Sequence, residues 1–260
     1  MRARHARDHR DGVKVPEVDL SFWVIKLGST AMGEALSDFL VHRLYPPLAV
    51  LLTLVAFGSA LSWQWTRRHY ETYPYWSAVI VISVFGTMAA DVAHVVLFVP
   101  YLVSALGFGL TLVVLFTLWY RVEGTVSIHS IASASREFFY WAAVLTTFAL
   151  GTALGDLSAT TGHFGFFSSA LLYGTLFTLI ALAFRVRLLG PVVTFWSCYI
   201  LTRPLGASLA DWLGVSPSRG GLNLGPGSVA LAFSAVLVAL VVSRARADRN
   251  VTRQLISPLG

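Results

Sequence analysis

Four copies of one motif run through the chain and constrain its fold more than any other feature. An aromatic residue and a tryptophan stand together at 22–23, 75–76, 140–141 and 195–196. Ten residues after each tryptophan comes a glycine, at Gly33, Gly86, Gly151 and Gly206. Fifteen residues after it comes an aspartate, at Asp38, Asp91, Asp156 and Asp211. The same spacing in four segments indicates an internal repeat, in which each copy is one unit of the fold.

Each repeat contains two apolar stretches, each long enough to cross a bilayer, which takes about 20 residues. The first carries the motif, over about 20–41, 75–98, 138–158 and 191–213, and the second is plainly apolar, over about 47–65, 101–120, 167–184 and 227–243. A segment in lipid must satisfy its own backbone hydrogen bonds, so all eight are expected to be helical. The sequence predicts an all-α bundle of eight transmembrane helices in contact with the lipid bilayer.

Composition supports a membrane protein. Only 12% of the residues are charged and 56% are hydrophobic, whereas soluble domains contain about 25% charged residues. The chain divides into a basic tail at 1–19, a membrane domain at 20–243 with repeats at about 20–65, 75–120, 138–184 and 191–243, and a second basic tail at 244–260. The single cysteine, Cys198, excludes an intramolecular disulfide.

The basic residues predict the topology. One side of the membrane collects both tails together with Arg67, Arg68, Arg121, Arg136, Arg185 and Arg187, whereas the other has only Arg43 and Arg219. The positive-inside rule then places both termini in the cytoplasm. This asymmetry accounts for the net charge of +6 without a nucleic-acid partner.

Two-helix repeats all start on the same side, which predicts pseudo-fourfold symmetry about the membrane normal, or two-fold symmetry between two-repeat halves. A homo-oligomer is compatible with either arrangement.

Polar residues follow one stripe of each motif helix. At 3.6 residues per turn, positions 0, +4, +7, +11 and +15 from the tryptophan share a face, which in the first repeat reads Trp23, Leu27, Thr30, Glu34 and Asp38. Threonines occupy +11 in the next two repeats, as Thr87 and Thr152. A carboxylate within a span costs about 2.5 kcal/mol or more, so such residues usually face the bundle interior and carry function. The alternative is that each aspartate only bonds a neighbouring helix.

The first and fourth repeats add an acid and a base near mid-membrane, Glu34 and Arg203. An unpaired arginine there is costly, so Glu34, Asp38 or Asp211 is predicted to pair with Arg203, as a structural lock or a gate. Lys26 is expected to extend toward the cytoplasmic surface. The tryptophans are expected to anchor the helices at the membrane interface, and the motif glycines to permit close helix packing.

Histidines give a weak hint of metal binding. His42 and His94 follow their motif aspartates by four and three residues, a spacing at which both side chains share a helix face and can bind a transition metal. A metal site would then use Asp38, Asp91, Asp156, Asp211, His42 and His94. Chance placement of the histidines in outer loops is the alternative. The sequence has no phosphate loop and no nucleophile–base arrangement, so no cofactor and no enzymatic activity are expected.

Several stretches resemble a bacterial family of uncharacterized membrane-anchored proteins. They are VPEVDLSFWVIKLGSTAMGEALSD, EGTVSIHSI, REFFYWAAVLTTFALGTALGD and FWSCYILTRPLGASLADWLG, and the resemblance covers nearly all of 15–243. It implies four tandem repeats of unknown function, each with two transmembrane segments and a tryptophan, in the bacterial inner membrane. It implies no particular activity.

The pattern favours a secondary transporter or exporter of a cation, with a divalent metal such as manganese as the first candidate. The ion or small solute would bind the four aspartates, Glu34 and the threonines Thr30, Thr87 and Thr152. Glu34 would act as the proton-coupling acid and Arg203 as its counter-charge. Two alternatives stay open: a cation channel with a ring of carboxylates, and a non-transporting membrane scaffold or sensor.

Overall fold

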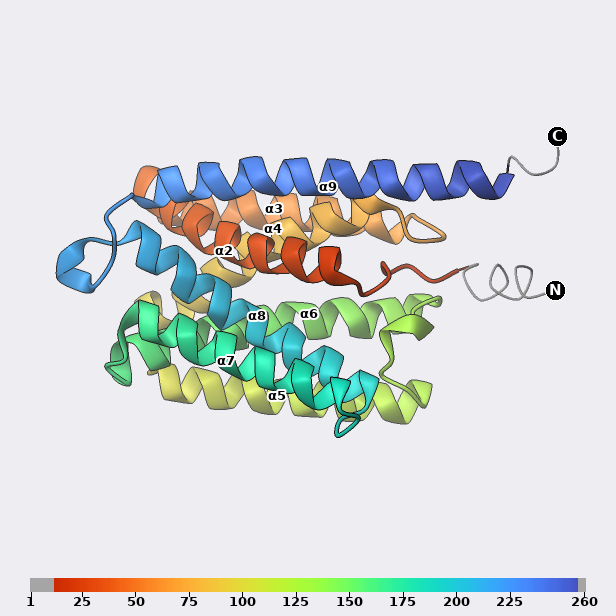
Figure 1. Ribbon diagram of the computed structural model, residues 1–260. Helices are drawn as coiled ribbons and strands as arrows, with labels where there is room; N and C mark the ends of the chain where they lie inside the picture. The colour runs from red at the N-terminus through yellow and green to blue at the C-terminus, as the bar shows by residue number, and fades with distance from the viewer. Residues whose placement is uncertain (1–11, 257–260) are drawn as a thin grey trace.

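The computed structural model describes residues 12–256 and contains eight long helices and no strand within that range (Figure 1). They are α2 (Leu20–Arg43), α3 (Pro46–Trp65), α4 (Thr72–Asp91), α5 (Tyr101–Glu123), α6 (Ala134–Asp156), α7 (Gly165–Arg185), α8 (Pro191–Gly214) and α9 (Pro226–Ile256). The all-α prediction is therefore confirmed. The tail residues Arg2, Arg4, Arg7 and Arg10 lie outside the described range.

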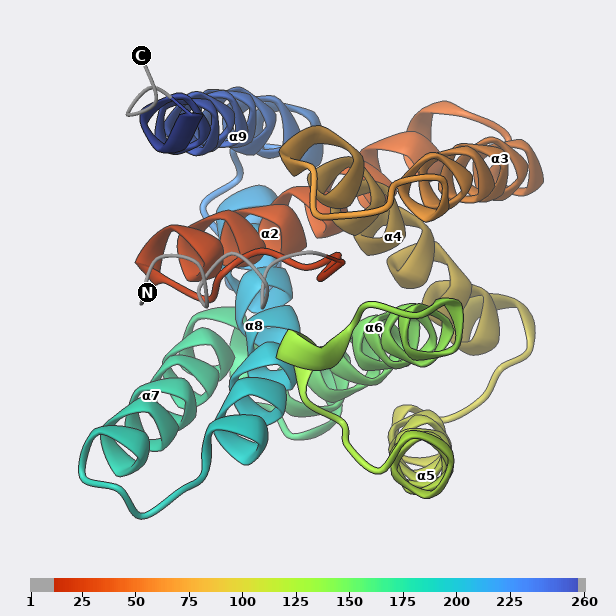
Figure 2. The ribbon, with the colours of Figure 1, turned by 90° about the vertical axis from the view of Figure 1, so that its right-hand side faces the viewer.

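The helices form two concentric rings. The motif helices α2, α4, α6 and α8 pack side by side in that order, and α8 closes the inner ring against α2 (Figure 2). The apolar stretches of α4 and α6 are 67% buried, whereas those of α3, α5, α7 and α9 are 17–22% buried. The motif thus marks the inner ring, and the plainly apolar helices form the outer one.

Each outer helix packs against the motif helix of the following repeat. α3 packs on α4, α5 on α6, and α7 on α8, while α9 returns to the beginning of the chain and packs on α2. The last helix therefore covers the first motif helix, which no preceding repeat can cover. This connection ties the two ends of the domain together.

Six of these helices are long and apolar enough to cross a membrane: α3, α4, α5, α6 extended to Thr161, α7 and α9 up to Asn250. By the same length and composition test, α2 and α8 do not qualify; α2 contains Lys26 and Glu34, and α8 contains Arg203. The outer helices expose large apolar side chains, such as Leu106 and Leu110 of α5. The chain is a membrane protein whose outer ring contacts lipid.

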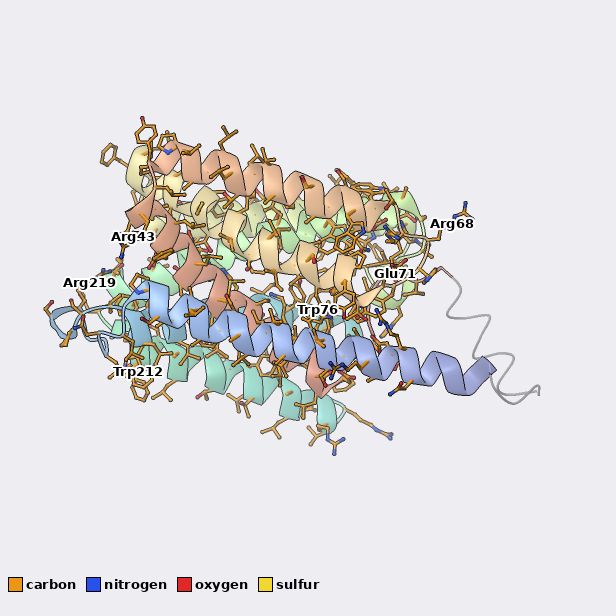
Figure 3. All side chains as sticks on the ribbon, turned by 90° about the horizontal axis from the view of Figure 1, so that it is seen from above. Arg43, Arg68, Glu71, Trp76, Trp212 and Arg219 are labelled. Carbon is orange, nitrogen blue, oxygen red and sulfur yellow. The ribbon has the colours of Figure 1, made fainter. Side chains whose placement is uncertain are left out.

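Charged residues mark the two ends of the bundle. α2 begins and α9 ends at one end, called here the terminal end (Figure 1). Arg68 and Glu71 lie at this end, whereas Arg43 and Arg219 lie at the opposite, distal end (Figure 3). All four motif helices run from the terminal to the distal end. α9 continues beyond residue 243, where the second tail was expected to begin.

Two of the motif helices end differently from the others. α4 and α6 each reach their motif aspartate and continue in one π-helical turn, Val92–Val96 and Leu157–Thr161. α2 and α8 pass their aspartates as regular α-helix. Such π turns often occur at functional sites, and here both directly follow Asp91 and Asp156.

Candidate functional site

The aromatic–tryptophan pairs form a collar around the bundle axis in its terminal half. The aromatic residue of each repeat contacts the tryptophan of the next, and the contact recurs at all four interfaces. The ring centroids are 5.6 Å apart for Phe22–Trp76, 5.7 Å for Tyr75–Trp141, 6.1 Å for Tyr140–Trp196 and 5.8 Å for Phe195–Trp23. These eight residues are called the aromatic collar below.

The collar overturns the prediction that the tryptophans anchor the helices in the membrane interface. Trp76, Trp141 and Trp196 are buried in the bundle core, and Trp23 is partly buried. The hydroxyl oxygens of Tyr75 and Tyr140 are 2.5 Å apart. Aromatic pairs at these distances add about 0.5–1.5 kcal/mol each beyond the area they bury. The collar therefore holds the inner ring together and fills its axis.

The motif glycines let neighbouring helices approach closely, as predicted. Each glycine lies against the residue at +7 of the next repeat: Gly33 against Ser83, Gly86 against Phe148, Gly151 against Arg203 and Gly206 against Thr30. A Cβ atom at any of the four would collide with that neighbour. The same contact at four interfaces explains why glycine recurs at this position.

The polar stripe is rotated from the predicted one. The +3 residues Lys26, Val79, Val144 and Tyr199 are fully buried, whereas the +4 residues Leu27, Ile80, Leu145 and Ile200 are only partly buried. The buried face also includes the small residues at +10 and +14. The centre of the buried face therefore lies to one side of the predicted stripe. The aspartates at +15 lie beside that centre.

Lys26 does not extend to the membrane surface, and that prediction was wrong. The side chain is 1% exposed. Its Nζ lies 4.1 Å from the ring centroid of Phe148 and 4.3 Å from that of Tyr199. Within the described part of the chain, Nζ has no hydrogen-bond or ion-pair partner. One helical turn past Phe22, α2 faces the core rather than the surface, so the lysine points inward.

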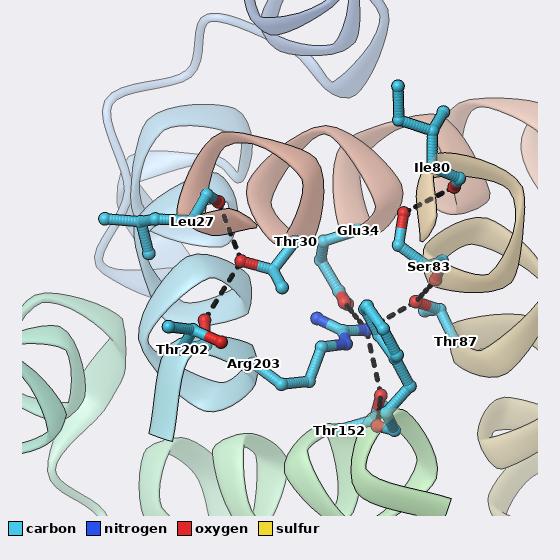
Figure 4. Close-up of polar contacts among 10 residues, drawn as sticks. Leu27, Thr30, Glu34, Ile80, Ser83, Thr87, Thr152, Thr202 and Arg203 are labelled. Carbon is cyan, nitrogen blue, oxygen red and sulfur yellow. Dashed lines mark hydrogen bonds and ion pairs between the residues drawn. The ribbon is translucent and has the colours of Figure 1, made fainter. Parts of the chain in front are cut away.

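A buried ion pair lies at the centre of the ring. Arg203 Nη2 of α8 donates to Glu34 Oε2 at 2.6 Å, to Thr152 Oγ1 at 2.8 Å and to Thr87 Oγ1 (Figure 4). Thr30 Oγ1 donates to the carbonyl oxygen of Thr202 at 2.9 Å. Glu34 is thus the partner among the three predicted carboxylates. One guanidinium nitrogen links α8 to the other three motif helices, and we call this group the central lock.

The four motif aspartates lie beyond the central lock, toward the distal end. All four side chains are partly buried. They interact electrostatically with one another and with Glu34. No hydrogen bond or ion pair to their carboxyl groups is found within residues 12–256. The structure therefore brings together Glu34, Arg203 and the threonines, and places the aspartates as unpaired acids beside them.

The two histidines of the predicted metal site each contact a backbone carbonyl close by in the chain. His42 Nδ1 lies 2.6 Å from the carbonyl oxygen of Asp38, and His94 Nδ1 lies 3.0 Å from that of Val99. The ring of His94 packs on Tyr101. Among the described residues, no three His, Cys, Asp or Glu side chains are grouped to hold a metal ion. Metal binding by the aspartates, His42 and His94 stays a prediction.

A strap formed by residues 12–19 covers part of the terminal end and was not foreseen from the sequence. Lys14 Nζ donates to Glu137 Oε2 at 2.5 Å, and Gln64 Nε2 donates to the other oxygen of Glu137 at 3.3 Å. Backbone bonds join Lys14 to Ile131 and Tyr70 to Val13. Glu137, in the first turn of α6, is 1% exposed. The strap thus connects the loops on the terminal side of α3 and α6.

Lys14→Met is expected to lower the free energy of unfolding by about 1.5–3 kcal/mol, because it leaves the buried carboxylate of Glu137 without its cation. Thermal unfolding in detergent, followed by tryptophan fluorescence, measures the loss. Arg67→Met is the control: its 3.6 Å ion pair with Glu71 is partly exposed, so the change should stay within about 0.5 kcal/mol. Equal effects from both variants would contradict a buried Lys14–Glu137 pair.

Two parts of the chain, residues 74–125 and 194–250, match the family model described as Repeat of Unknown Function (DUF347). These two parts of the chain are similar to this repeat. The matched segments contain α4 with α5 and α8 with α9, which are the second and fourth of the four motif copies. The match confirms the resemblance to a family built of repeats of unknown function. No curated protein and no solved structure matches the chain.

Proposed function

We propose that the protein is a secondary transporter of a cation across the bacterial inner membrane, built from eight membrane-spanning helices with pseudo-fourfold symmetry about the membrane normal. The symmetry is supported by three contacts that recur around the inner ring: aromatic residue on tryptophan, glycine on the +7 residue, and outer helix on the next motif helix. Parallel two-helix repeats are expected to produce such an axis.

α2 and α8 span the membrane in this proposal despite their charges. Both lie inside the inner ring, where α7 and α9 pack against them and reduce their contact with lipid. Glu34 and Arg203 neutralise each other in the central lock. A buried, paired charge is tolerated within a membrane domain, whereas one facing lipid is costly. Length and composition alone therefore fail to identify α2 and α8 as helices that cross the membrane.

The terminal end faces the cytoplasm in this proposal. Arg67, Arg68 and Arg121 lie at the ends of helices or loops on this side, whereas Arg43 and Arg219 lie on the distal side. The positive-inside rule supports this orientation. The four aspartates then face the outside, in the distal half of the bundle.

One observation carries the transport proposal: four acidic side chains, for which residues 12–256 supply no hydrogen-bond or ion-pair partner, lie one helical turn beyond the layer of the buried Glu34–Arg203 pair. Carboxylates in a membrane bundle attract cations and usually carry function. A cation that enters among the aspartates competes with Arg203 for Glu34. Release of Arg203 would also free Thr87 and Thr152, and so loosen three helix contacts at once. Glu34 then accepts a proton or the cation, and Arg203 serves as its counter-charge.

Closure on the terminal side favours a transporter over an open channel. Phe148, fully buried at +7, and the aromatic collar fill the axis between the central lock and the terminal end, and the strap adds a third barrier there. In a transporter, closure on one side with binding groups on the other corresponds to one state of alternating access.

Cation flux into proteoliposomes, with and without a pH gradient, tests the proposal. The panel contains manganese, other divalent ions, sodium and small organic cations. Asp156→Asn is expected to reduce flux at least tenfold, since its side chain loses the charge that attracts the cation. Glu71→Gln, which changes a partly exposed acid at the terminal end, is the control and should transport as the wild type does.

Each alternative outcome has its own signature. Fast flux without a gradient would indicate a channel with a carboxylate ring. Absence of flux for every ion, from protein shown to be folded, would overturn the transport proposal. If Asp156→Asn then lowered only the thermal stability, the acids would serve a scaffold or sensor.

A further inference from the structure

The amine of Lys26 lies against two aromatic rings, a position that a bound ammonium ion could also take. Its Nζ is in contact with the rings of Phe148 and Tyr199, and no carboxylate, carbonyl or hydroxyl among the described residues hydrogen-bonds to it. Aromatic faces attract ammonium groups through the ring quadrupole, and aromatic cages are a recurring way to recognise them. Phe148 and Tyr199 thus form a small cage, and a side chain of the protein itself occupies it.

The cage lies on the same axis as the proposed transport path. Lys26 and Tyr199 belong to the +3 layer, which lies between the aromatic collar and the layer of Phe148. Phe148 is one helical turn from Thr152 of the central lock. A cation moving from the aspartates past the lock therefore meets the cage next.

Other polar groups near the cage also have no partners. The hydroxyl of Tyr199 is buried and makes no hydrogen bond with the described residues, and the same is true of Arg203 Nε and Nη1. A hydroxyl oxygen can accept a hydrogen bond from an ammonium N–H. Tyr199 therefore offers a bound ammonium its ring face, and its hydroxyl, at the edge of the ring, is a separate unused acceptor.

The chemistry of the cage distinguishes between classes of cation. Manganese and other divalent ions favour several oxygen ligands, carboxylates among them, and the described part of the chain has no group of three His, Cys, Asp or Glu side chains that could hold a metal ion. An organic ammonium is recognised by aromatic faces. The separate aspartates and the Phe148–Tyr199 pair suit the second class.

We propose that the transported cation is a small organic ammonium, and that Lys26 occupies its cage in the empty protein as a tethered competitor. This inference rests on the proposed transport function. The substrate ammonium displaces the Lys26 side chain from Phe148 and Tyr199, and the lysine returns when the substrate leaves. Lys26 thus prevents the cage from standing empty between transport events.

Methylammonium binding to the purified protein tests the proposal, measured by calorimetry in detergent and by uptake of labelled methylammonium into proteoliposomes. Lys26→Met keeps the length of the side chain and removes its charge. It is expected to tighten methylammonium binding by about tenfold, because the competitor no longer reduces the fraction of binding-competent protein.

Phe148→Leu should weaken methylammonium binding both in the wild type and in the Lys26→Met variant. Arg68→Gln, which removes a surface charge at the terminal end, controls for a general effect of net charge.

The outcomes separate this inference from the function on which it rests. Manganese or sodium flux without saturable methylammonium binding would overturn the ammonium proposal and leave cation transport standing. Unchanged or weaker binding in folded Lys26→Met protein would overturn the role of Lys26 as competitor. If Lys26→Met does not fold, Lys26→Arg retains the charge and should keep the weak binding of the wild type, whereas tight binding would contradict the proposal. No flux of any cation would instead remove the transport function itself.

Discussion

Arg203→Met is expected to lower the free energy of unfolding by about 3–5 kcal/mol, one of the largest losses that a single substitution in this chain should cause. The substitution removes the guanidinium and leaves Glu34 buried without a partner, and an uncompensated buried charge is strongly destabilising. It also removes the donor to Thr87 and Thr152, so α8 loses these three side-chain links to α2, α4 and α6 at once and keeps the hydrogen bond from Thr30 to the carbonyl oxygen of Thr202. Thermal unfolding in detergent measures the effect.

The double variant Glu34→Gln with Arg203→Met separates pairing from packing. If the loss in the single variant comes from the charge left on Glu34, the double variant should recover most of it, because no buried charge remains. Arg43→Met, at the distal end, is the surface control and should change stability by no more than about 0.5 kcal/mol. Losses that simply add in the double variant would show that Glu34 and Arg203 are not coupled.

Much of the architecture follows from the spacing of a few residues. The recurrence of tryptophan, glycine and aspartate predicted four parallel motif helices, and the apolar stretches between them predicted four further helices, which the structure places in the outer ring. The need to pair a charge in the membrane predicted a carboxylate partner for Arg203. These inferences succeed because each depends on one helix at a time, or on the cost of an isolated charge.

The inner face of each helix was harder to predict. Positions +3 and +4 both lie close to the line from the tryptophan to +7, and only the rotation of the helix in the bundle decides which one is buried. The small residues at +10 and +14 carried that information, since close contacts form where side chains are small. Giving them more weight would have placed Lys26 in the core.

The other missed contacts are between residues far apart in the chain. Nothing local distinguishes a tryptophan that anchors a helix in the interface from one that packs on a neighbouring repeat, although each repeat supplies both an aromatic residue and a tryptophan for such a contact. Lys14 and Glu137 pair across a separation of 123 residues, and no spacing rule connects a tail to the first turn of a later helix. Such pairs depend on the tertiary arrangement alone.

Gly206→Ala is expected to destabilise the protein by about 1–3 kcal/mol, whereas Gly107→Ala should stabilise it by up to about 1 kcal/mol. Alanine normally improves a helix relative to glycine, and a Cβ at Gly107 of α5 meets no atom within 4 Å. At Gly206 the added methyl group meets the side chain of Thr30 and, at 2.9 Å, the backbone nitrogen of Ala31. The helices α2 and α8 must then move apart, and overpacking of this kind costs more than the helix gains.

The opposite signs make this pair of variants a direct test of the ring. Separation of α2 from α8 would also break the hydrogen bond from Thr30 to the carbonyl of Thr202 and lengthen the Glu34–Arg203 contact, so Gly206→Ala should reduce transport as well as stability. Because the same contact recurs at Gly33 and Gly151, alanine there should act in the same direction. Stabilisation by Gly206→Ala equal to that by Gly107→Ala would mean that α2 and α8 do not close the inner ring, and the common axis on which the central lock and the ammonium cage depend would be lost.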